Sequence, residues 1–142
     1  MGRVMALDVG TKTIGVAVSD PLRLFARPLY TLSRQGVRRD CEELHKHVTA
    51  QDVDHLVVGL PLELDGSEGR STRLARQIGA VMVELTGLPL TYIDERYSSV
   101  EAERHLLHAD VSRARRKEVI DQAAAVVILQ SFLEHGDWTQ DG

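Results

Sequence analysis

The stretch MALDVGTKTIGVAVSD, from Met5 to Asp20, contains two apolar runs joined by the turn sequence Gly-Thr-Lys-Thr. Residues 14–19 alternate large and small side chains, which is the period of a strand. Because the connection is short, the two runs are predicted to be antiparallel neighbours in a hairpin. Asp8 lies inside the first run, where burying a carboxylate without a partner would cost several kcal/mol. Either the following turn satisfies Asp8, or Asp8 belongs to a functional site.

Length and composition are those of one soluble globular domain. The 142 residues are 43% hydrophobic and 27% charged, and they contain no repeat and no linker. We expect one domain over residues 1–138 and a C-terminal tail over 139–142. With a single cysteine no intrachain disulfide can form, and the sequence shows neither an apolar leader nor a run long enough to span a membrane. These features favour a cytoplasmic protein without membrane contact.

Patterning along the rest of the chain predicts alternating strands and helices. Short apolar runs predict strands, and apolar residues spaced three or four apart predict helices. After the hairpin the expected elements are a strand at 27–32, a helix at 37–48, a strand at 54–61, a helix at 74–85, a strand at 90–94, a helix beginning at Ser98 and an apolar helix at 117–134. This order predicts a mixed sheet with helices on both faces.

Two more carboxylates stand at unusual places. Glu95 directly follows the predicted strand 90–94, and Asp121 lies on the apolar face of the last helix, where the alanines at 124–125 would let that helix approach the sheet. Each has an ordinary alternative, an ion pair with a nearby Arg or Lys. Together with Asp8, however, they share one explanation, which is convergence on a divalent cation. Ligand sets made of oxygen alone favour Mg²⁺ or Mn²⁺ over zinc.

Other catalytic patterns are absent from the sequence. The run Gly10-Thr11-Lys12-Thr13 lacks the first glycine of a phosphate-binding loop. No Gly-x-Ser-x-Gly motif occurs, and the histidines do not show a metal-binding spacing. Cys41 lies on the apolar stripe of the helix at 37–48, which favours a core position over a reactive thiol.

Four segments carry a wider resemblance, namely ALDVGTKTIGVAVSD (6–20), VVGLPLELDGSEG (57–69), YIDERYSS (92–99) and KEVIDQAAAVVIL (117–129). In this order they resemble the YqgF family of Holliday-junction resolvases, a branch of the RNase H-like superfamily. The match covers nearly the whole chain, whereas Asp-x-Gly-Thr alone also occurs in actin-like sugar kinases. The resemblance implies an α/β RNase H-like fold with a five-stranded mixed sheet of order 3-2-1-4-5 and helices on both faces.

The same resemblance implies the site residues. Asp8, Glu95 and Asp121 would be the catalytic and metal-binding acids, and these are the three acids that the cost of burial also selects. The cofactor implied is Mg²⁺ or Mn²⁺. Relatives that resolve four-way junctions are described with four acids, so Glu118 or Asp94 would be the fourth acid here.

Basic and hydroxyl side chains around these acids are expected to contact a nucleic-acid backbone. The net charge of −4 gives no general attraction to nucleic acid, but arginines cluster locally. Contacts of this kind bind phosphates rather than bases. The predicted contact residues are Thr11, Lys12, Arg70, Arg73, Arg96, Ser98, Ser99, Arg113, Arg115 and Arg116.

These observations predict a Mg²⁺-dependent endonuclease that hydrolyses phosphodiester bonds. Its substrate would be branched DNA, as in junction resolution, or structured RNA, as in processing of the 5′ end of precursor small-subunit ribosomal RNA. A second hypothesis is a nucleic-acid-binding ribosome-maturation factor with little or no catalysis, and a third is an actin-like phosphotransferase. The resemblance also permits a homodimer, which would suit symmetric cleavage of two strands.

Overall fold

The structure is a computed structural model, and it describes residues 2–61, 65–95, 113–135 and 139–140, without the side chains of 113–121, 135, 139 and 140. Its elements follow the predicted order. They are β1 (Arg3–Val9), β2 (Thr13–Ser19), β3 (Ala26–Ser33), α1 (Val37–Ala50), β4 (Val53–Leu60), α2 (Arg70–Thr86), β5 (Leu90–Asp94), α4 (Arg113–His135) and β6 (Thr139–Gln140). The helix expected to begin at Ser98 lies outside the described residues.

The strands of the described segments form one mixed sheet of order β3-β2-β1-β4-β5-β6. β1 and β2 are antiparallel, as the short Gly-Thr-Lys-Thr connection predicts, and β2 is also antiparallel to β3. β1, β4 and β5 are parallel to one another. The predicted order 3-2-1-4-5 is therefore confirmed. The short strand β6 adds an antiparallel edge beside β5, which the sequence did not predict because two residues carry no readable alternation.

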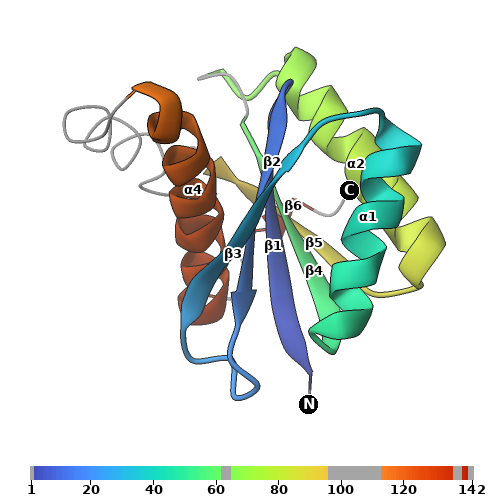
Figure 1. Cartoon of the computed structure of the whole chain (residues 1–142), viewed down its shortest axis with the longest axis vertical. Coiled ribbons are helices and arrows are strands. Elements are labelled where there is room, and N and C mark those ends of the chain that lie inside the picture. The colour runs from blue at the N-terminus through green and yellow to red at the C-terminus, as the bar shows by residue number, and fades with distance from the viewer. Residues whose placement is uncertain (1, 62–64, 96–112, 136–138, 141–142) are drawn as a thin grey trace.

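Helices cover both faces of the sheet, as predicted (Figure 1). α1 and α2 lie on one face and α4 lies on the other. Alternate residues of β1 enter the two cores, since Met5 and Leu7 pack on the side of α1 and α2 whereas Val4 and Ala6 pack on the side of α4. We call these surfaces the α1/α2 face and the α4 face.

α4 lies against the sheet through small side chains. Ala124 and Ala125 are fully buried, and they share the core of the α4 face with Ala6 of β1 and Ala17 of β2. Small residues on both surfaces allow a close approach of helix and sheet, as the sequence predicts. Close packing brings the backbone of α4 near any polar side chain that β1 presents on this face.

Cys41 is a core residue, as the helical pattern predicts. It is fully buried in α1, and its thiol lies 3.6 Å from the carbonyl oxygen of Ile78. Burial raises the pKa of the Cys41 thiol to about 11, so the thiol stays protonated at neutral pH and is a poor nucleophile. In the described part of the chain, no helix is both long and apolar enough to cross a membrane.

Candidate active site

Asp8 lies near the end of β1 on the α4 face. It is 5% exposed and follows Val4 and Ala6 in the alternation that faces α4. The strand register pairs Asp8 with Gly15 of β2, and Gly15 with Thr31 of β3. Because Gly15 has no side chain, β2 places no side-chain atoms directly beside Asp8 in this register.

Glu95 directly follows β5, and its carboxylate lies over the neighbouring strand β4. A methyl group built on Gly59 of β4 would lie 3.0 Å from Oε2 of Glu95 and 2.5 Å from Cδ1 of Ile128 in α4. The Glu95 side chain is 6% exposed. Gly59 thus leaves the space that Glu95 occupies between the sheet and α4.

Asp8 and Glu95 approach the same glycine from opposite sides. Leu7 pairs with Val58, so Asp8 of β1 lies beside Gly59 of β4, one residue further along the two parallel strands. β5 lies on the far side of β4, two strand spacings or about 10 Å from β1. The carboxylate of Glu95 covers part of this distance, because it lies over Gly59. The structure therefore brings two of the three predicted acids to one place.

The backbone of Asp121 lies at the same level of the sheet. Its side chain belongs to the part of α4 that is not described, but the next residue, Gln122, donates a hydrogen bond of 3.0 Å from Nε2 to Oγ1 of Thr31. Thr31 pairs with Gly15, and Gly15 pairs with Asp8, so these three residues form one row across β3, β2 and β1. α4 consequently passes this row at residues 121–122.

Asp94 lies on the opposite face from Glu95, as strand alternation predicts. It is 2% exposed and pairs with Leu60, which belongs to the core of the α1/α2 face. Its preceding neighbour Ile93 packs on the α4 face. Glu118, the other predicted fourth acid, lies one turn before Asp121 in α4, and its side chain is not described.

The chemistry of this site fits a divalent cation. Two buried carboxylates that converge repel one another, and a cation between them would compensate their charge. Among the side chains that the structure describes, which exclude that of Asp121, no three His, Cys, Asp or Glu residues lie together in a metal-binding arrangement. The backbone of α4 carries Asp121 past this level of the sheet, next to Gln122.

Predicted nucleic-acid contacts gather at the same end of the sheet, around a cavity of about 390 Å³. Thr11, Arg70 and Arg73 line this cavity, and Lys12 is exposed in the turn beside it. In Figure 1 this turn between β1 and β2 lies at the same end of the molecule as the start of α2. The other predicted contacts are not placed: Arg96, Ser98 and Ser99 lie outside the described residues, and Arg113, Arg115 and Arg116 belong to α4 without described side chains.

Sequence patterns did not assign a role to Arg34 and Asp40. Arg34 lines the cavity of Thr11, and its Nε donates a hydrogen bond of 2.7 Å to Oδ2 of Asp40, which is 2% exposed. A signal for Asp40 exists in the sequence, because Asp40, Leu44 and Val48 are spaced by four residues on the buried stripe of α1. An aspartate on such a stripe requires a buried partner, and Arg34 supplies it.

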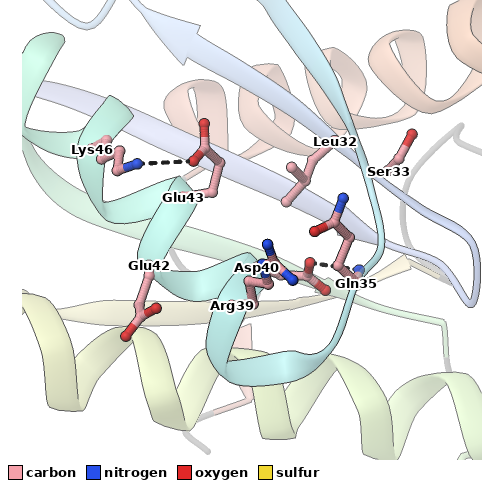
Figure 2. A pocket seen from close by; sticks show the side chains of 8 residues that line it. All are labelled: Leu32, Ser33, Gln35, Arg39, Asp40, Glu42, Glu43 and Lys46. Atoms are coloured by element: carbon pink, nitrogen blue, oxygen red, sulfur yellow. Dashed lines mark hydrogen bonds and ion pairs between the residues drawn. The ribbon is translucent and has the colours of Figure 1, made fainter.

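A second, larger cavity of about 660 Å³ lies between the end of β3 and α1 (Figure 2). Its described lining contains three acids, Asp40, Glu42 and Glu43, against Arg39 and Lys46. Figure 2 shows the Lys46–Glu43 contact, whose Nζ–Oε2 distance is 3.3 Å. Neither Asp8 nor Glu95 lines this cavity. Its mixed charge and the absence of both acids from its described lining make it a poor candidate for the site.

The fold and the family comparison define the class of protein. The mixed sheet of order 3-2-1-4-5 with helices on both faces is the predicted RNase H-like fold. The family model described as RuvX, Holliday junction resolvase, matches residues 2–135, and the chain belongs to this family. The resemblance to the YqgF family is thereby confirmed.

Similar proteins agree with this assignment. The chain is 48% identical over 132 residues to a protein of Myxococcus xanthus, covering 93% of this chain and 87% of that one, and 50% identical over 133 residues to a protein of Paracoccus denitrificans, covering 94% and 84%. Both relatives are named "Putative pre-16S rRNA nuclease".

Solved structures share the fold. RuvC of T. thermophilus in complex with a Holliday junction substrate superposes with a TM-score of 0.58 at 16% identity, covering 97% of this chain and 98% of that one. The resolvase of Fowlpox virus in complex with Holliday junction DNA superposes with a TM-score of 0.53 at 8% identity, covering 93% and 97%. At these identities the similarity concerns the fold alone.

Proposed function

We propose that the protein is a metal-dependent endonuclease that hydrolyses phosphodiester bonds in structured nucleic acid. The observation that carries this proposal is the approach of Asp8 and Glu95 to Gly59, at the level where α4 passes with Asp121. Carboxylates that converge repel one another, and divalent cations between them would reduce that repulsion. Membership of a resolvase family supports the same chemistry.

Asp8, Glu95 and Asp121 would hold Mg²⁺ or Mn²⁺ in this site. Two such ions, when bound, activate the attacking water and stabilise the leaving oxygen of an in-line displacement at phosphorus. The remaining residues bind and orient the substrate. Thr11 and Lys12 lie in the turn that follows Asp8, where backbone N–H groups and an ammonium can hold a backbone phosphate.

Two substrates fit the proposed chemistry. The name of the two relatives points to precursor 16S ribosomal RNA, whereas the family description points to the four-way DNA junction. Both substrates contain duplex segments, whose phosphates are bound without reading the sequence. We favour the precursor RNA, because relatives of nearly 50% identity carry that name along almost their whole length.

Cleavage of matched substrates tests the proposal. The panel is a precursor RNA that contains the 5′ end of 16S ribosomal RNA, a four-way DNA junction, linear duplex DNA and single-stranded DNA, each with Mg²⁺, Mn²⁺ or EDTA. We expect cleavage of a structured substrate with either metal and none in EDTA, because three carboxylates without cations cannot accept a phosphodiester. Cleavage that persists in EDTA would contradict the metal site. Binding without cleavage under every condition would instead support the maturation-factor hypothesis.

Gly59→Ala is expected to lower cleavage activity by more than its loss of folding stability alone would explain. The added methyl group would meet Ile128, which can rotate away, and the Glu95 carboxylate, which would have to leave its place over β4. Overpacking of this kind costs about 1–3 kcal/mol in the free energy of unfolding. Gly79→Ala is the matched control, because its methyl group would meet the Tyr92 hydroxyl on the α1/α2 face. Equal losses of activity per unit of lost stability in both variants would contradict the role of Gly59.

A further inference from the structure

The cavity of about 390 Å³ beside the β1–β2 turn has three arginines in its lining, Arg34, Arg70 and Arg73. We call it the arginine cavity. Its other described lining residues are Thr11, Leu74 and Gln77, so none of the described lining residues carries a carboxylate. The first turn of α2, which holds two of the arginines, contains no acidic residue either. Arg34 is paired with Asp40, so the excess positive charge around this space comes from Arg70 and Arg73, at the positive end of the α2 dipole.

Arg34 is fixed in place before any ligand arrives. Its side chain is 12% exposed, and its Nε pairs with the Asp40 carboxylate, which is 1% exposed. Its Nη1 donates to the carbonyl oxygen of Gly10 at 3.3 Å, and its backbone N–H donates to the carbonyl oxygen of Lys12 at 2.9 Å. Among the described residues these contacts engage Nε and Nη1, and the donors of Nη2 remain for a ligand. A guanidinium held in this way loses little conformational entropy when it binds an anion.

The arginine cavity and the convergent acids lie on opposite sides of the β1–β2 turn. Leu74, which lines the cavity, packs against the core of the α1/α2 face. Asp8 faces α4 and lies only three residues before Thr11, a length of chain that spans at most about 10 Å. A phosphate in the cavity is consequently close to the acids and is separate from the phosphate that they would cleave.

We propose that the arginine cavity binds one backbone phosphate of the nucleic-acid substrate at a fixed offset from the bond that is cleaved. The inference rests on the proposed function. Arginine is suited to this role because its planar fork donates two parallel hydrogen bonds to phosphate oxygens. Asp40 does not touch the substrate, and it acts as a positioning residue for Arg34.

The fixed offset has a consequence for where the strand is cut. With one phosphate held in the arginine cavity, the strand is placed over Asp8 and Glu95 in one register, and a single bond is presented for cleavage. Without that anchor, neighbouring bonds reach the acids equally well. Loss of the anchor therefore changes the position of cleavage, and a general loss of stability would not do so.

Arg34→Gln tests the inference, with Arg39→Gln as the matched control, because Arg39 lines the larger cavity with mixed charge. Binding of the four-way junction and of the precursor RNA is measured in EDTA over a series of salt concentrations. We expect Arg34→Gln to weaken binding about 10-fold and to reduce the salt slope by about one, since one charge-assisted phosphate contact is lost. Arg39→Gln is expected to change neither quantity. Equal binding by the two variants would overturn the inference.

Mapping of the product ends gives the second readout. With Mg²⁺ present, we expect Arg34→Gln to spread cleavage over neighbouring bonds, while Arg39→Gln keeps the wild-type position. Asp40→Asn should spread it as well, because the neutral amide holds the guanidinium less firmly. Arg34→Lys keeps the positive charge but loses the planar fork, so it should also spread cleavage, and it replaces Arg34→Gln in the test if that variant fails to fold. Unchanged cleavage positions in both Arg34→Lys and Asp40→Asn would overturn the inference.

Inorganic phosphate and adenosine monophosphate distinguish a substrate phosphate from a free nucleotide. We expect both to compete with nucleic acid in the millimolar range or more weakly, because each supplies one phosphate without the rest of the strand. Tight binding of the nucleotide that does not displace nucleic acid would overturn the inference. If the wild-type protein neither binds nor cleaves the RNA or the junction, the proposed function fails. If Arg34→Gln cleaves normally at the wild-type position, only the proposed role of the arginine cavity is rejected.

Discussion

Asp8→Asn is expected to lower the rate of phosphodiester cleavage by at least about 10²-fold at saturating substrate and Mg²⁺. Asp8 lies near the end of the central strand β1, with glycines beside it on both neighbouring strands. Neither glycine places a side chain beside the Asp8 carboxylate, and the Glu95 carboxylate lies over Gly59 on the side of β4. Asparagine keeps the shape but removes the negative charge, so the affinity of the site for divalent cations falls.

The same substitution is expected to leave the fold and the binding of nucleic acid intact. Asparagine is close in volume to aspartate, and we expect the free energy of unfolding to change by less than about 1 kcal/mol. Binding measured in EDTA should match the wild type, because the phosphate contacts lie in the turn after β1 and at the start of α2. Full cleavage activity in a purified Asp8→Asn preparation would reject the nuclease assignment.

Glu95→Gln is expected to lower cleavage by about 10²-fold, whereas Asp94→Asn retains the activity of the wild type. The two acids are neighbours in the chain and both are buried, but they differ in the face on which they lie. Glu95 reaches over Gly59 toward Asp8, while Asp94 pairs with Leu60 in the register of the α1/α2 face. The comparison therefore separates a role in the site from a role in the packing of β5.

Measurements of both cleavage and thermal unfolding are needed for this pair. A lower melting temperature for Asp94→Asn with normal cleavage by the folded fraction agrees with the assignment. If Asp94→Asn abolishes cleavage without a change in stability, Asp94 is the fourth acid and its side chain must reach the site. If Glu95→Gln cleaves normally, the position of Glu95 over Gly59 has no catalytic meaning.

Elements with a clear local period were predictable from the sequence. Residues 14–19 alternate strictly, and a short turn precedes them, so the β1–β2 hairpin and its antiparallel pairing followed directly. α1 and α2 were predicted from their apolar stripes, and α2 ends before Gly87, whose φ of 69° is left-handed, close to the predicted end at residue 85. β6 could not be predicted, since a pair of residues carries no period.

The candidate site was predictable only in part. Asp8 and Glu95 were identifiable because a carboxylate in or directly after an apolar strand is costly, and this cost can be read locally. Gly59 was not identifiable, because its role arises only when β5 and α4 bring Glu95 and Ile128 onto β4. The partner of Asp40 was equally hidden, since the pairing with Arg34 depends on how the loop after β3 turns into α1.

The convergence over Gly59 has a consequence for the order of synthesis. Asp8 leaves the ribosome among the first residues, whereas Glu95 and α4 are made after more than half of the chain. β4, whose glycine provides the space between the acids, must already lie beside β1 before Glu95 can occupy its place. A nascent chain therefore carries only one half of the acid pair. Under the proposed function, such a chain cannot cut nucleic acid, and the RNA that surrounds it during translation is spared until the sheet is complete.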